Sequence, residues 1–173
     1  RRPKPDDFQI KEAAELIKKS KKPIIIAGGG VFYSDATDEL SSFASKHNIP
    51  VTQTVMGYSS IKKDHSHYLG TIGGLGGKAA NNLSKETDTA IAIGTKLADF
   101  TTGSWANFEN PDFKLVSINA ARFDANKHMA QAIVGDAKVS LIELSHALGS
   151  WKADESWYKK SRTELKNWEA YVD

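Results

Sequence analysis

A short apolar run that ends in three glycines constrains the fold of this chain most. Residues 23–27 read Pro-Ile-Ile-Ile-Ala without a polar residue, and Gly28, Gly29 and Gly30 follow directly. A run that is apolar at every position is typical of a strand buried on both faces, as in the interior of a parallel sheet. Glycines at its carboxyl end let the backbone turn sharply and lie against a ligand or a neighbouring strand. We therefore expect a candidate site at the tip of this strand.

The same alternation of apolar strands and amphipathic helices continues along the chain. Helices are expected from Asp6 or Asp7, over 35–47, over 78–85 and after Asp136, and strands at 49–55, 89–94, 113–118 and 131–134. This order predicts an α/β fold with a doubly wound, mostly parallel sheet in three layers, Rossmann-like and of the type that binds NAD or FAD. The polar stretch 56–69 is expected to be a surface loop.

Length and composition favour one compact domain. The chain has 173 residues, of which 40% are hydrophobic and 25% charged, as in ordinary globular proteins. We assign this domain to residues 1–150. Residues 151–173 follow it as an aromatic, amphipathic segment, and we expect a helical linker that packs on something outside this sequence.

Charge and cysteine content exclude several classes of partner and site. Lys and Arg number 23 against 21 Asp and Glu, so the net charge of +2 indicates neither nucleic acid nor an anionic membrane as a partner. The absence of cysteine excludes disulfides, thiolate metal sites and a cysteine nucleophile, and it fits a cytoplasmic protein.

Candidate binding residues follow two of the predicted strands. Gly28, Gly29 and Gly30 could cradle a diphosphate with backbone amides or could only form the tight turn, and the sequence leaves both alternatives open. The loop after the strand at 89–94 belongs to the same edge of the sheet, so a ligand contact is expected there too. Its candidate binding residues are Gly94, Thr95, Lys96 and Asp99.

Other motifs are weaker. Residues 74–79 match the G-x-G-x-x-A pattern of dinucleotide-binding loops, but Lys78 is followed by alanine, so they are not a P-loop. His65 and His67, beside Asp64, could bind a metal, but on a polar loop a role in stabilising a turn is favoured. Serine-hydrolase and zinc-protease signatures are missing, so we predict neither a catalytic residue nor a metal ligand in this chain.

The order of these segments carries a resemblance to a known family. Segments 22–30, 92–103, 116–119 and 134–137 resemble the central domain of thiamine-diphosphate-dependent enzymes such as acetolactate synthase. Residues 99–105 are most similar to a branch of carbon–carbon hydrolases that open a cyclic trihydroxy-dione in myo-inositol breakdown.

The resemblance implies that the chemistry lies outside this sequence. Thiamine diphosphate and magnesium would be bound by flanking pyrimidine-binding and diphosphate-binding domains of one longer chain that forms a homo-oligomer, and this segment alone would be inactive. Relatives with FAD have an arginine where this chain has Lys96 and an acidic residue near Asn119. Lysine cannot make the bidentate contact of arginine, which argues against FAD.

Two alternatives to this assignment stay open. The first is a free-standing regulatory module that binds FAD, NAD or ADP. The second is a nicotinamide-consuming deacylase, which the absence of cysteines for a zinc module disfavours.

Overall fold

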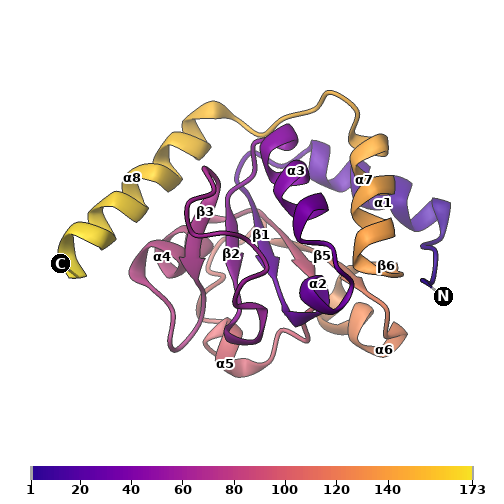
Figure 1. Cartoon of the computed structure of the whole chain (residues 1–173), viewed down its shortest axis with the longest axis horizontal. Coiled ribbons are helices and arrows are strands. Elements are labelled where there is room, and N and C mark those ends of the chain that lie inside the picture. The colour runs from indigo at the N-terminus through magenta and orange to yellow at the C-terminus, as the bar shows by residue number, and fades with distance from the viewer. Residues whose placement is uncertain (1, 173) are drawn as a thin grey trace.

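The computed structural model describes residues 2–172, which form a six-stranded parallel sheet in the order β3-β2-β1-β4-β5-β6 (Figure 1). This is the doubly wound order, with its reversal between β1 and β4, so the predicted fold class is confirmed. The strands are β1 (Pro23–Ala27), β2 (Val51–Gln53), β3 (Tyr68–Thr71), β4 (Thr89–Ile93), β5 (Lys114–Asn119) and β6 (Gln131–Val134).

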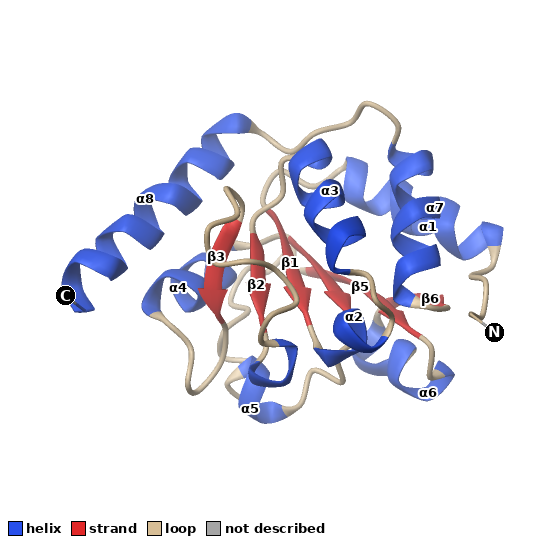
Figure 2. Ribbon diagram, in the orientation of Figure 1, coloured by secondary structure: helices blue, strands red, loops and turns tan. Residues whose placement is uncertain are grey.

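Helices cover both faces of the sheet (Figure 2). One face packs against α1, α3 and α7, and the other against α4 and α8, so each face has its own apolar cluster. The helices are α1 (Asp7–Lys18), α2 (Gly29–Tyr33), α3 (Thr37–His47), α4 (Lys78–Glu86), α5 (Asp99–Thr102), α6 (Arg122–Ala125), α7 (Ala137–Leu148) and α8 (Glu155–Val172), with 3-10 turns η1 (Val55–Gly57) and η2 (Lys127–Met129).

The central strands owe their continuous apolar sequence to burial on both faces. Every residue of β1 and of β4 is buried, and successive side chains of β1 alternate between the two clusters. Ile25 contributes to the cluster under α1, α3 and α7, whereas Ile24 and Ile26 contribute to the cluster under α4 and α8.

Two aspartates cap helices as the sequence predicts. The side chain of Asp6 accepts hydrogen bonds from the amides of Phe8 and Gln9 at the start of α1. The side chain of Asp136 does the same for Lys138 and Val139 at the start of α7. Both satisfy amides that a helix leaves without an internal partner.

The structure corrects the sequence prediction around β2. The predicted strand 49–55 is only three residues long, and the predicted loop 56–69 was wrong at its end, because Tyr68 and Leu69 pair with β2 as part of β3. The predicted helix 35–47 is preceded by a separate short helix, α2, that begins inside the glycines. Asp35, with a φ of 52°, separates α2 from α3.

The segment after residue 151 packs partly on the chain itself. Trp157 of α8 is only 3% exposed, and its indole Nε1 donates a hydrogen bond of 2.8 Å to the carbonyl of Pro23. The guanidinium of Arg162 donates to the carbonyls of Ser66 and Tyr68, which ties α8 to β3. A role of 151–173 as a linker stays a prediction. Within residues 2–172, no helix is both long and apolar enough to span a bilayer.

Candidate functional site

The glycines after β1 and β4 contact each other at the carboxyl edge of the sheet. The Gly28 amide donates to the carbonyl of Ile93 at 2.8 Å, and the Gly30 amide donates to the carbonyl of Gly94 at 2.9 Å. A Cβ on Gly30 would lie 2.6 Å from the Gly94 Cα, closer than real Cβ atoms come. The two loops therefore need glycine because their backbones cross in contact.

This crossing lies at the point where the strand order reverses, between β1 and β4. Ligands of open α/β sheets bind in the crevice at that point. Here the backbones of Gly30 and Gly94 fill it, and two of the amides expected to face a diphosphate are already bonded to carbonyls. Of the two alternatives left open by the sequence, this geometry favours the tight turn. Cofactor contact through the glycine loop stays a prediction.

A hollow of about 550 Å³ lies beside the crossing, over the carboxyl ends of β4, β5 and β6. Four of the predicted binding residues line it: Gly30, Gly94, Thr95 and Lys96. The wall also includes residues that the sequence analysis did not single out, among them Ser34, Asn119 and Asp124. The structure thus gathers the two predicted loops around one hollow.

The remaining predicted binding residues lie elsewhere. Gly28 and Gly29 do not line the hollow, and a Cβ on Gly29 would lie 2.9 Å from the carbonyl oxygen of Met56. Asp99 is exposed as the first residue of α5. Its carbonyl accepts a hydrogen bond from the Ser104 amide, so it helps to close a turn.

Asn119 has a structural reason to be an amide. Its Nδ2 donates to the Thr95 carbonyl at 3.3 Å, and its Oδ1 accepts from the Ala121 amide at 2.9 Å. A carboxylate could not donate to the carbonyl and would face it unpaired. The side chain thus ties the end of β5 to the loop after β4.

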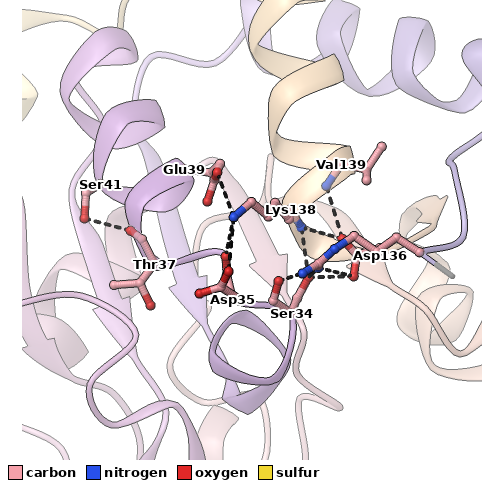
Figure 3. A network of polar contacts seen from close by, with 9 residues as sticks. Ser34, Asp35, Thr37, Glu39, Ser41, Asp136, Lys138 and Val139 are labelled. Atoms are coloured by element: carbon pink, nitrogen blue, oxygen red, sulfur yellow. Dashed lines mark hydrogen bonds and ion pairs between the residues drawn. The ribbon is translucent and has the colours of Figure 1, made fainter.

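A polar network closes the other side of the hollow (Figure 3). The Ser34 hydroxyl donates to the Asp136 carboxylate at 2.6 Å, and the Arg2 guanidinium lies 3.1 Å from the same carboxylate. Burial alone would raise the pKa of Asp136, but hydrogen bonds from Ser34, Val139 and Arg2 together hold that pKa below its ordinary value. Sequence reasoning identified Asp136 only as a cap, because no local pattern reports contacts more than 100 residues away.

The glycine loop before α4 is closed by side chains of this chain. Asn81 accepts from the Gly73 amide at 2.9 Å and donates to the Gly73 carbonyl at 3.1 Å. A Cβ on Gly77, the N-cap of α4, would lie 2.7 Å from the Trp168 indole nitrogen. The loop that matched the dinucleotide pattern therefore packs against α8.

The two histidines of the loop before β3 take part in packing. His67 Nε2 lies 3.0 Å from the Asn48 side-chain oxygen, and its ring packs on Tyr158 of α8. Burial, with the charges of His65 and Arg162 adding to it, lowers the pKa of His67 to about 4. Residues 2–172 contain no group of three or more His, Cys, Asp or Glu that could hold a metal ion.

Fold and site together define an α/β domain of the nucleotide-binding class in which backbone fills the usual ligand crevice. A model of one family, described as the central domain of thiamine pyrophosphate enzymes, matches residues 10–144. The chain belongs to this family, as its resemblance predicted.

Curated relatives are similar over nearly the whole chain. A 3D-(3,5/4)-trihydroxycyclohexane-1,2-dione hydrolase of Clostridium perfringens strain 13 is 41% identical over 160 residues, 92% of this chain and 25% of the relative. The corresponding hydrolase of Clostridium botulinum strain Alaska E43 is 43% identical over 166 residues, 96% of this chain and 25% of the relative. Hydrolase 2 of that name from Bacillus cereus strain ZK is 39% identical over 165 residues, 95% and 26%. The chain thus spans about a quarter of the length of these relatives.

Proposed function

We propose that this chain is the central domain of a longer thiamine-diphosphate-dependent hydrolase that cleaves a carbon–carbon bond of a cyclic trihydroxy-dione in myo-inositol breakdown. One observation carries the proposal: the relatives that bear this hydrolase name are 39–43% identical over 92–96% of the chain. Family membership supports the cofactor, since the matching family consists of thiamine pyrophosphate enzymes.

The residues of this chain do not fit a site for the cofactor itself. Magnesium bound to a diphosphate requires several oxygen ligands, and the described residues hold no acidic or histidine cluster of that kind. Thiamine diphosphate and magnesium would therefore be bound by the flanking domains. We assign no step of the ring opening to a residue of this chain, and the chain by itself would be inactive.

The domain would serve as a scaffold in the longer protein. Its two apolar clusters give it a core of its own, and α8 would lead from it toward the next domain. Assembly of the longer protein into a homo-oligomer and its location in the cytoplasm belong to the same proposal.

Flavin is not part of the proposed function. The side chain of Asn119 is engaged with the Thr95 carbonyl, where an acidic residue is expected in flavin-bearing relatives. Lys96 replaces the expected arginine and is exposed at the hollow. Neither residue offers the charge or the bidentate geometry that such a nucleotide would use.

The test is an assay of the complete open reading frame that encodes this sequence. The longer protein, supplied with thiamine diphosphate and magnesium, is expected to consume the trihydroxycyclohexane-dione with release of one carboxylate for each ring opened. The 173-residue chain alone is expected to leave the dione unchanged. Turnover without thiamine diphosphate, or turnover by the 173-residue chain, would contradict the proposal.

The hollow of about 550 Å³, edged by Lys96, favours one second candidate, a nucleotide-binding regulatory module. Its volume is in the range of small-molecule sites. The crossing of Gly30 and Gly94 weighs against it, because amides that would face a phosphate are occupied.

A further inference from the structure

Large apolar side chains are exposed mainly at one edge of the sheet. Among residues 2–172, thirteen large hydrophobic side chains are exposed, and eight of them follow directly after the carboxyl ends of β1, β2, β3, β4 and β5. α2, α5 and α6 lie along this edge in Figure 2. Leu75, 73% exposed, and Phe100, 54% exposed, represent the loops after β3 and β4. Aromatic and large aliphatic residues at a surface are typical of interfaces.

Leu75 and Phe100 belong to two loops that touch. The Gly74 amide donates to the Phe100 carbonyl at 3.0 Å, and a Cβ on Gly74 would lie 3.2 Å from the Phe100 ring. The two loops follow β3 and β4, so their contact bridges the carboxyl ends of β2 and β1, which lie between them. We call Leu75 and Phe100 the carboxyl rim.

The C-terminal end of α8 lies beside the carboxyl rim. Trp168 covers Gly77, two residues beyond Leu75, and the Lys78 ammonium lies 4.4 Å from the centre of the Tyr171 ring. Tyr171 and Val172 are themselves 72% and 62% exposed. The last described residues thus extend the apolar surface of the rim.

The N-terminal segment lies at the opposite end of the same edge. The carbonyl of Pro3 accepts a hydrogen bond of 2.9 Å from the amide of Asp136, which follows β6. Because β6 and β3 are the outermost strands, the two ends of the chain flank the carboxyl edge (Figure 1). The segment nearest to the carboxyl rim is therefore the one after Val172.

We propose that the part of the longer chain that follows Val172 packs on the carboxyl rim. This inference rests on the proposed function, since it needs the longer chain. The matching family describes this region as a central domain, and about three quarters of each relative lies outside the match, so chain is available to cover the rim. Burial of two large apolar side chains would stabilise the docked state.

Radical footprinting of the complete protein and of the 173-residue chain tests this. Labelling of Leu75 and Phe100 is expected to be strong in the 173-residue chain and to fall in the complete protein to the level of the buried Phe43. Phe8 on α1, 68% exposed, is the control and is expected to keep its labelling in both. Unchanged labelling of the rim, or an equal loss at Phe8, would overturn the inference.

A photocrosslinker identifies the occupant. With p-benzoylphenylalanine in place of Phe100, the complete protein is expected to form crosslinks to residues after Val172 of the same polypeptide. Crosslinks to the segment before Arg1 or to a second copy of the chain would overturn the inference. Neither readout depends on activity, so a protected rim in a protein without hydrolase activity would refute only the proposed function.

Discussion

Replacing Gly94 with alanine is expected to destabilise the chain more than the same change at Gly103. Both glycines have a left-handed φ, 60° for Gly94 and 59° for Gly103, which costs an L residue roughly 1–2 kcal/mol. They differ in what a new Cβ would meet. At Gly94 it would lie 2.5 Å from the Gly30 Cα, whereas at Gly103 it would lie 3.3 Å from the Asn107 side-chain oxygen.

The difference between the two variants isolates the backbone crossing. A side-chain end such as that of Asn107 can rotate away, but two backbones cannot separate without shifting β1 or β4. Overpacking of this kind adds about 1–3 kcal/mol. We therefore expect a loss of about 2–5 kcal/mol for Gly94→Ala and of roughly 1–2 kcal/mol for Gly103→Ala.

Urea unfolding of the purified 173-residue chain, followed by circular dichroism, measures both losses. Each kcal/mol corresponds to a shift of about 2–4 °C in Tm for a domain of this size, so thermal unfolding gives a second measurement. Equal losses for the two variants, or a Gly94→Ala variant as stable as the parent, would refute the explanation of the glycines as a close backbone approach.

Three further predictions concern buried contacts. Trp157→Ala is expected to lower the free energy of unfolding by about 3–5 kcal/mol, because it removes a buried ring that anchors α8, whereas Val172→Ala should change it by less than about 0.5 kcal/mol in denaturant titrations. The pKa of His67 is lowered to about 4, so the unfolded state binds the proton first and stability is expected to fall as the pH drops from 6.5 toward 4. The loss should reach about 1–3 kcal/mol, and His67→Gln, measured beside His146→Gln, should flatten the pH profile only in part, because burial also lowers the pKa of His47. Asp136→Asn is expected to cost about 1–2 kcal/mol at neutral pH, and Asp35→Asn less than about 0.5 kcal/mol, since Asp136 is held charged by its partners whereas Asp35 is exposed; equal melting temperatures would contradict this.

The sequence predicts the central sheet well because burial leaves a direct trace in it. The apolar runs of β1 and β4, the caps Asp6 and Asp136, and the placement of Gly28 and Gly94 on one edge are all confirmed. β3 escaped in part because it is a short edge strand that includes Gly70, and nothing in its pattern separates it from a loop.

The site is harder to predict because its geometry depends on contacts distant in sequence. Periodicity brings Gly30 and Gly94 to the same edge, but it does not tell that their backbones touch and occupy each other's hydrogen-bonding groups. The link from Arg2 to Asp136 joins residues at opposite ends of the domain, and no local signal reports it. The packing of Trp157 under β1 likewise depends on where α8 turns back over the sheet.

Calorimetric titration of the 173-residue chain with thiamine diphosphate and magnesium, ADP, NAD and FAD tests the central claim, that these strand tips are packed backbone and the cofactor is bound elsewhere. We predict no heat of binding for any of the four with this chain, and binding of thiamine diphosphate to the complete protein. Micromolar binding of a nucleotide or of thiamine diphosphate to the 173-residue chain would contradict the account.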